Sequence, residues 1–160
     1  MKKEIIRILQ DNGRMTPEEI AERLDTDAET VNNLIAELEK ENVIRGYRAV
    51  IDETKIDSSK VKAIIEVHIR PQREGGFDNI AKRIANFAEV TSLYLVSGGY
   101  DLELEVQGAT LQDVAGFVSS KLATIDGVTS TATHFILKKY KEAGKIFEDG
   151  EHYERLKVTP

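Results

Sequence analysis

The stretch that decides the fold runs from Ile20 to Ile44 and reads IAERLDTDAETVNNLIAELEKENVI. Its polar centre, residues 25 to 27, separates two helical patterns, and Asp27 is of a residue type that caps helix N-termini. Beyond it, apolar residues recur at the spacing that buries one stripe of a helix. They are Ala28, Val31, Leu34, Ile35 and Leu38. The stretch therefore predicts two helices joined by a tight turn.

The residues before this stretch predict where the first helix begins and what covers the pair. Thr16 and Glu19 form a capping box around Pro17, so a helix should run from Pro17 to about Leu24. An upstream helix, ended by Gly13, supplies a further apolar stripe of Ile5, Ile6, Ile8 and Leu9. We expect three short helices around one small core.

The second helix of the pair is polar on the side that faces away from this core. In a helix-turn-helix, the early positions of that helix reach base edges in the major groove of DNA. Thr30, Asn32 and Asn33 occupy those positions, and asparagine can pair with adenine through two hydrogen bonds. The alternative is a plain packing unit, because many amphipathic helix pairs bind no DNA.

The β-prone run from Val43 to Ile51 is interpreted as a wing beside the three helices. Arg45 and Arg48 within it can contact phosphates, which position a protein on DNA without reading its sequence. Residues 1 to 52 contain eight Lys or Arg and twelve Asp or Glu, which leaves a formal charge of −4. DNA-binding domains are usually basic. Contact with DNA must therefore depend on Arg14, Arg45 and Arg48 and on several copies acting together.

Composition is that of an ordinary soluble globular protein. Of 160 residues, 41% are hydrophobic and 31% are charged, which does not suggest disorder. No apolar run is long enough to span a bilayer, and no signal-peptide core follows Met1. The absence of cysteine excludes disulfides, thiolate metal sites and a cysteine nucleophile. We expect a cytoplasmic protein with no membrane partner.

The chain changes character after residue 52, which predicts two domains. Residues 53 to 60 are polar and predict a linker, residues 61 to 140 a second domain, and residues 141 to 160 a C-terminal tail. The second domain begins with a strand that ends at Pro71, because apolar and polar residues alternate along it. Its inward residues are Ala63, Ile65, Val67 and Ile69.

Helix and strand patterns alternate through the rest of this domain. Gly75 and Gly76 open a helix, and strands over residues 90–97 and 100–106 flank Gly98 and Gly99, a strong hairpin signal. Thr110 caps another helix, and a last strand covers residues 128–137. The predicted inward faces of the two helices are Phe77, Ile80, Ala81, Ile84 and Ala85, and Leu111, Val114, Ala115, Val118 and Leu122.

The order strand, helix, strand, strand, helix, strand matches the ferredoxin-like βαββαβ unit. The predicted fold class is therefore α+β, a winged helix-turn-helix followed by a ferredoxin-like domain. Both helices should cover one face of an antiparallel sheet. The other face is either solvated or packed against the same face of a second copy, with opposite charges paired. It would carry Lys62, Glu66, His68, Arg70, Asp101, Glu103 and Glu105.

Three segments resemble the Lrp/AsnC (leucine-responsive regulatory protein) family of prokaryotic transcription regulators. They are TVNNLIAELEKENVIRGYRAVID from Thr30, VSGGYDLELEV from Val96 and GVTSTATHFILKKYKE from Gly127. The resemblance implies dimers formed through the C-terminal sheets, often assembled into octamers of four dimers, that bind double-stranded DNA. It also implies a small-molecule effector, typically an amino acid, at the interface between dimers.

The resemblance also implies particular site residues. Thr30, Asn32 and Asn33 fall where the family's recognition helix faces DNA. Asp101 falls on the hairpin that edges the effector pocket, where its carboxylate can hold an α-ammonium group, and threonine hydroxyls opposite can bind a carboxylate. Turn geometry alone also explains the glycines of this hairpin. The implied effector residues are Gly98, Gly99, Tyr100, Asp101, Thr131 and Thr133.

Catalytic motifs are not evident. His68, His134 and His152 lack metal-ligand spacing, and there is no nucleophile elbow or phosphate-binding glycine loop. We therefore expect no enzyme, cofactor or metal site. A second class of function stays open, because relatives of this layout include tetrapyrrole decarboxylases and the first half of the chain is acidic. In that class the protein is a metabolite sensor or tetrapyrrole-processing enzyme whose helix-turn-helix reads no DNA.

Overall fold

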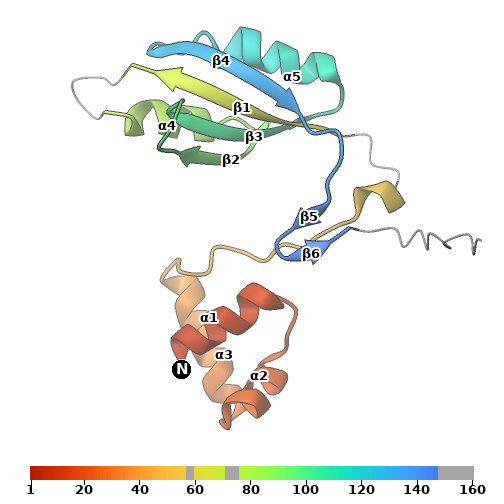
Figure 1. Ribbon diagram of the computed structural model, residues 1–160. Coiled ribbons are helices and arrows are strands. Elements are labelled where there is room, and N and C mark those ends of the chain that lie inside the picture. The colour runs from red at the N-terminus through yellow and green to blue at the C-terminus, as the bar shows by residue number, and fades with distance from the viewer. Residues whose placement is uncertain (57–59, 71–75, 148–160) are drawn as a thin grey trace, which may run out of the picture. The chain divides into compact units, whose positions relative to one another are not determined.

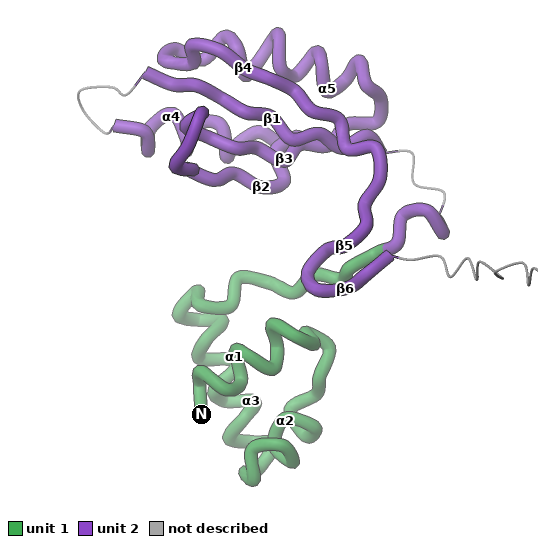
Figure 2. Tube along the Cα trace, in the orientation of Figure 1, with its two compact units in different colours: residues 1–51 green, residues 52–160 purple. Residues whose placement is uncertain are grey.

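The computed structural model describes residues 1–56, 60–70 and 76–147, which fall into two compact units, residues 1–51 and residues 52–160 (Figure 2). Unit 1 consists of the helices α1 (Lys2–Asp11), α2 (Pro17–Leu24) and α3 (Ala28–Lys40) (Figure 1). Apolar residues from all three helices are buried together: Ile5, Ile20, Ala21, Val31 and Leu38. The predicted three-helix core is confirmed.

The ends of these helices follow from local hydrogen bonds. Glu19 N–H donates to the Thr16 hydroxyl (3.3 Å) and Thr16 N–H to the Glu19 carboxylate (2.8 Å), which is the predicted capping box. At the end of α3, the N–H groups of Val43 and Ile44 both donate to the carbonyl of Leu38 (2.9 and 3.1 Å). Such bonds satisfy carbonyls that a helix end leaves without partners.

The β-prone run of residues 43 to 51 forms no strand, although all nine residues are described. A strand needs a partner to satisfy its backbone groups, and unit 1 otherwise consists of helices and their connections. The β-prone run that the sequence predicts as a wing therefore forms no strand within unit 1.

Unit 2 contains a four-stranded antiparallel sheet and two helices. The sheet order is β2-β3-β1-β4, which is the ferredoxin-like arrangement that the element order predicted. The elements are β1 (Val61–Ile69), α4 (Asp78–Ala85), β2 (Val90–Leu95), β3 (Leu102–Gly108), α5 (Leu111–Phe117) and β4 (Val128–Phe135).

One face of this sheet packs against both helices, as Figure 1 shows. The inward residues of β1 are buried as their alternation predicted, and those of β3 join them. Opposite them lie Ile80 and Ile84 of α4 and Val114 and Phe117 of α5. The aromatic rings of Phe87 and Phe117 meet edge to face, with centroids 5.5 Å apart.

The helix after Thr110 differs from its predicted inward face. Thr110 and Asp113 form a capping box, but Leu111 is 50% exposed and Phe117, which the spacing did not select, is buried. A π-helical segment, η2 (Val118–Leu122), follows α5 directly. Both departures lie before this segment, since Val118 packs against the core and Leu122 is buried as predicted.

Short elements lie in the passages predicted as linker and tail. A 3₁₀ turn, η1 (Glu53–Lys55), begins after Asp52, whose carboxylate accepts from Thr54 N–H (3.1 Å). The strands β5 (Lys141–Glu142) and β6 (Lys145–Ile146) form a small hairpin. The remaining parts of these two passages, residues 57–59 and 148–160, lie outside the described residues, as do residues 71–75 with Pro71 and Gly75.

Candidate functional sites

The turn between α2 and α3 is held by bonds from its own residues. Asp25 adopts the left-handed conformation at φ 51°, and Thr26 N–H donates to the carbonyl of Ala21 (3.1 Å). Asp27 then caps α3, because its carboxylate accepts from the Thr30 hydroxyl (2.6 Å) and from Thr30 N–H (2.7 Å). These two bonds lower the pKa of Asp27. The result is a helix, a short turn and a second helix, a helix-turn-helix.

The predicted base-reading residues of α3 differ in what they can still bind. The Thr30 hydroxyl already donates to Asp27, so it can only accept a further bond without breaking the cap. Asn32 and Asn33 are exposed, and no hydrogen bond engages either amide within the part of the chain that the structure describes. Two of the three residues therefore keep a full amide for an outside partner.

The carboxylates at the C-terminal end of α3 are paired inside unit 1. Lys2 Nζ lies 3.0 Å from Glu37 Oε2 and 3.3 Å from Glu41 Oε1, and its hydrogen bond with Glu37 is the main cause of a raised Lys2 pKa. The Tyr47 hydroxyl donates to Glu39 (3.0 Å); partial burial, then this bond, raises the Tyr47 pKa. The acidity that the sequence places on α3 is thus partly compensated by groups from distant positions.

The three predicted phosphate-contacting cations are exposed. Tyr47 lies against the turn after α1, since a Cβ on Gly13 would meet its ring carbon at 3.4 Å. This contact brings the segment of Arg45 and Arg48 beside the turn that carries Arg14. Sequence reasoning selected the three arginines but missed Tyr47, which joins their segments.

The predicted effector hairpin is a six-residue loop between β2 and β3, and it is bound to β1. Val96 N–H donates to the Asp101 carbonyl (2.9 Å), and Asp101 N–H donates to the Val67 carbonyl (3.1 Å). The Asp101 carboxylate also accepts from Ile69 N–H (2.8 Å). Asp101 therefore has a structural role at the end of β1, beside any role toward a ligand. Above Gly98 and Gly99 the space is open, because a Cβ on either would meet nothing within 4 Å.

Tyr100 and the two threonines lie at separate places around this hairpin. The Tyr100 hydroxyl donates to Glu103 Oε2 (2.6 Å), and this bond is the main cause of its raised pKa. Thr131 and Thr133 pair with Val67 and Ile65 on the side of β1 away from β3. Two strand spacings amount to about 10 Å. The structure thus brings Gly98, Gly99, Tyr100 and Asp101 together but keeps the threonines on the far side of β1.

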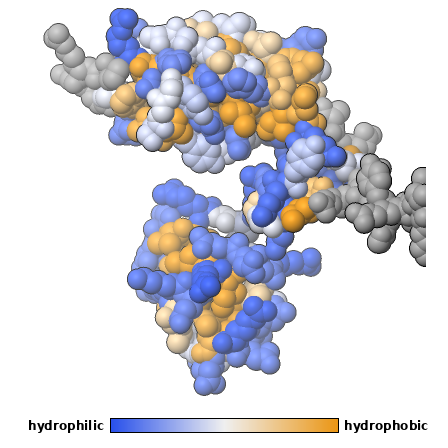
Figure 3. Space-filling model, in the orientation of Figure 1, coloured by the Kyte–Doolittle hydropathy of each residue, from blue (hydrophilic) through white to orange (hydrophobic). Residues whose placement is uncertain are grey.

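The helix-free face of the sheet is polar and rich in carboxylates. Glu66 of β1 and Glu103 of β3 are directly opposite each other, and His134 Nε2 lies 3.4 Å from Glu66 Oε1. Ser92 donates to Glu105 (2.9 Å). Two residues predicted on this face lie elsewhere. The Asp101 carboxylate accepts from Ile69 N–H of β1, and Arg70 follows Ile69, the last residue of β1. Figure 3 shows hydrophilic and hydrophobic residues side by side over the visible surface of this unit.

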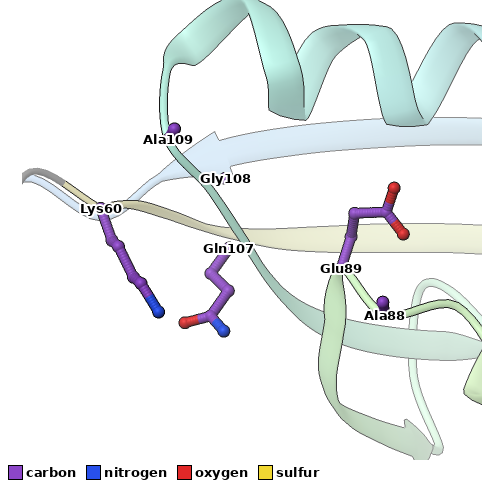
Figure 4. A pocket seen from close by; sticks show the side chains of 6 residues that line it. All are labelled: Lys60, Ala88, Glu89, Gln107, Gly108 and Ala109. Atoms are coloured by element: carbon purple, nitrogen blue, oxygen red, sulfur yellow. The ribbon is translucent and has the colours of Figure 1, made fainter.

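A separate pocket of about 370 Å³ lies at the other end of β3, and none of the predicted site residues lines it. Its walls include Lys60, Glu89 and Gln107 (Figure 4). The Lys60 and Gln107 side chains extend to the same side, whereas Glu89 points away from them. Lys121 Nζ holds Glu89 at 2.5 Å and lowers its pKa. The polar groups of this pocket thus do not converge on one point.

Two other site types were sought among the described residues. No group of three or more His, Asp or Glu side chains there is placed to hold a metal ion. None of the helices described is long and apolar enough to cross a membrane.

A helix-turn-helix unit followed by a ferredoxin-like unit is the layout of two-domain transcription regulators. Comparison with protein-family models agrees with this layout in both units. Residues 1–45 match a winged helix-turn-helix DNA-binding domain, and residues 62–146 match the Lrp/AsnC ligand binding domain. The chain belongs to the Lrp/AsnC family and is a DNA-binding transcription regulator of that type.

Individual relatives cover almost the whole chain. The uncharacterized HTH-type transcriptional regulator YugG of Bacillus subtilis is 49% identical, over 98% of this chain and 95% of its own length. The leucine-responsive regulatory protein of Rhizobium meliloti is 30% identical, over 89% and 90%. Among solved structures, the transcriptional regulator NMB0573/L-Met complex from Neisseria meningitidis has a TM-score of 0.68 at 26% identity, covering 88% of this chain and 90% of the other.

Proposed function

We propose that this regulator binds specific double-stranded DNA sequences through α3 and changes its binding when a small molecule occupies the second unit. The observation that carries the DNA-binding site is the pair of exposed amides, Asn32 and Asn33, on an α3 whose later carboxylates are held by Lys2 and Tyr47. The Thr30 hydroxyl accepts a hydrogen bond from the DNA. The side chains of Arg14, Arg45 and Arg48 contact phosphates.

The division of labour that we propose follows the predicted boundaries. Residues 1–52 bind DNA, residues 53–60 link the two parts, and residues 61–140 bind the effector and hold the oligomer. Residues 141–160 form a C-terminal tail. The protein works in the cytoplasm as a regulator and not as an enzyme.

The proposed effector is an amino acid. A Neisseria relative of similar fold is described as a complex with L-Met, and the open hairpin of Gly98 and Gly99 offers backbone groups to a close ligand. Asp101 receives the ammonium group, with Tyr100 beside it. Because Thr131 and Thr133 lie across β1 from Asp101 within one copy, the proposed site lies between dimers and receives their hydroxyls from another copy.

The proposed assembly is a dimer through the helix-free sheet faces, and several dimers form an octamer. In support, this face carries Lys62 and two imidazoles, His68 and His134, beside the carboxylates of Glu66, Glu103 and Glu105. Two copies related by a twofold axis can place cations of one sheet against carboxylates of the other. Several copies also add weak DNA contacts together, which residues 1–52, with a formal charge of −4, need.

The test is a gel-shift titration of the full-length chain on the DNA upstream of its own gene. We expect binding at low salt that falls steeply as salt rises, because phosphate contacts release counterions. Absence of binding at low salt, with and without each of the twenty amino acids, would contradict the proposal. That result would favour a metabolite sensor with a silent helix-turn-helix, which the acidity of unit 1 keeps as the second candidate.

A further inference from the structure

The outward stripe of α3 has an uncharged centre. At ~100° per residue, the residues opposite the buried Val31 and Leu38 are Glu29, Asn33, Ala36 and Lys40. The two charged members lie at the ends of this stripe, each four residues from the nearest uncharged member. The part of α3 that can approach a flat surface most closely therefore consists of one amide and one methyl group.

The nearby carboxylates are turned to other partners. Glu37 and Glu41 pair with Lys2 on one flank of α3, and Glu39 accepts from Tyr47 on the other. At the helix start, both carboxylate oxygens of Asp27 accept from Thr30. The middle of α3 can consequently enter a groove between phosphates with these four carboxylates held by groups of unit 1.

An amide and a methyl group on adjacent turns match one kind of base pair. An asparagine amide has one acceptor and one donor, which fit the N6 amino group and N7 of adenine in the major groove, whereas guanine offers two acceptors there. An alanine methyl fits the C5 methyl of thymine. Asn33 and Ala36 are three residues apart, so their side chains lie on neighbouring turns of the same face.

We propose that Asn33 reads an adenine of the operator and that Ala36 contacts the methyl group of a thymine next to it. This inference rests on the proposed function, since it names the bases that α3 recognises. Asn32 lies toward the Glu39 flank of the helix and contacts the DNA backbone rather than a base edge.

The experiment uses duplexes selected by the full-length protein from a random-sequence pool. Each conserved adenine of the selected site is replaced in turn with 7-deazaadenine, which keeps base pairing but lacks the N7 acceptor. We expect about tenfold weaker binding at one position per half-site, because one of the two hydrogen bonds to that adenine is lost. Replacing the neighbouring thymine with uracil, which lacks the methyl group, should also weaken binding.

Variants assign the contact to its side chain. Asn33→Ala should bind the unmodified site about tenfold less tightly and should no longer distinguish adenine from 7-deazaadenine. Ala36→Gly should likewise lose the distinction between thymine and uracil. Asn86→Ala, which changes an asparagine that is also exposed but lies in unit 2, is the control and should behave as the wild type.

The outcomes separate this inference from the proposed function. Selected sites without a conserved adenine, or an Asn33→Ala variant that still responds to 7-deazaadenine, would overturn the adenine contact while the protein remains a DNA-binding regulator. If no duplex is enriched from the pool even at low salt, the proposed function fails as well.

Discussion

The carboxylate of Asp101 is predicted to have two separable roles, one in folding and one in binding an amino acid. In the structure it accepts from Ile69 N–H at 2.8 Å in a partly buried position. A hydrogen bond to a charged group contributes about 1.5–3 kcal/mol to the free energy of unfolding. Asp101→Ala removes this bond without replacing it. Asp101→Asn keeps an oxygen acceptor, so it should lose no more than about 1 kcal/mol.

The expected shifts in melting temperature follow from the size of unit 2. For a domain of about 100 residues, 1 kcal/mol corresponds to about 4 °C. Asp101→Ala should therefore melt about 6–12 °C below the wild type, and Asp101→Asn within about 4 °C of it. Differential scanning calorimetry of the full chain, without any amino acid, measures both values.

Addition of the amino acid that stabilises the wild type then tests the binding role. A ligand at 100 times its dissociation constant adds about 2.7 kcal/mol. Asp101→Asn should lose at least half of this gain, because an amide pairs only weakly with an ammonium group. If Asp101→Asn keeps the full gain, the carboxylate does not hold the ammonium. If Asp101→Ala melts with the wild type, the bond to β1 contributes nothing and the structural reasoning is wrong.

Three further predictions concern other parts of the chain. Gly127→Ala should lower the stability of unit 2 by about 1–3 kcal/mol in urea titration, because Gly127 has φ +95° and a Cβ there would lie 2.5 Å from Ile80 Cδ1. The control Gly116→Ala, which has open space and helical backbone, should not destabilise the unit. Asp27→Asn should be less stable than the wild type above about pH 5. Hydrogen bonds from Thr30 hold the Asp27 pKa below 3.8, so this advantage of the wild type should vanish as pH falls through that lowered pKa. A constant difference in melting temperature down to pH 2 would contradict this prediction. Lys2→Ala should weaken DNA binding at low salt, because it releases two carboxylates on α3; equal affinity in gel-shift titrations would show that these carboxylates lie away from the DNA.

The sequence was sufficient wherever a few neighbouring residues determine the structure. The capping box at Thr16, the N-cap at Thr110 and the alternation along β1 each act within a few residues, and the structure contains all three. The sheet order followed from the order of these elements. The buried face of α5 was predicted only in part, because Leu111 in its first turn is exposed and Phe117 is buried.

The features of the sites that the sequence did not predict depend on contacts between residues that are far apart in the chain. Lys2 and Glu37 are far apart in the chain, so a formal charge of −4 for residues 1–52 hid the fact that one lysine holds two carboxylates of α3. The bond from Ile69 to Asp101 likewise joins β1 to a loop that sequence patterns treat separately. The threonines of β4 were selected by resemblance, which cannot show that β1 separates them from Asp101 within one copy.

The loop between β2 and β3 is ordered by hydrogen bonds within the chain itself. At its ends, Val96 N–H donates to the Asp101 carbonyl. Asp101 also binds β1 twice, because its N–H donates to the Val67 carbonyl and its carboxylate accepts from Ile69 N–H. A freely moving loop would lose about 1–2 kcal/mol of conformational entropy for every residue that binding orders. Here the conformational entropy of the loop residues is lost when the protein folds, so binding does not lose it again. An amino acid bound at this loop, as we propose, would therefore keep most of its interaction energy to favour one assembly of the protein over another.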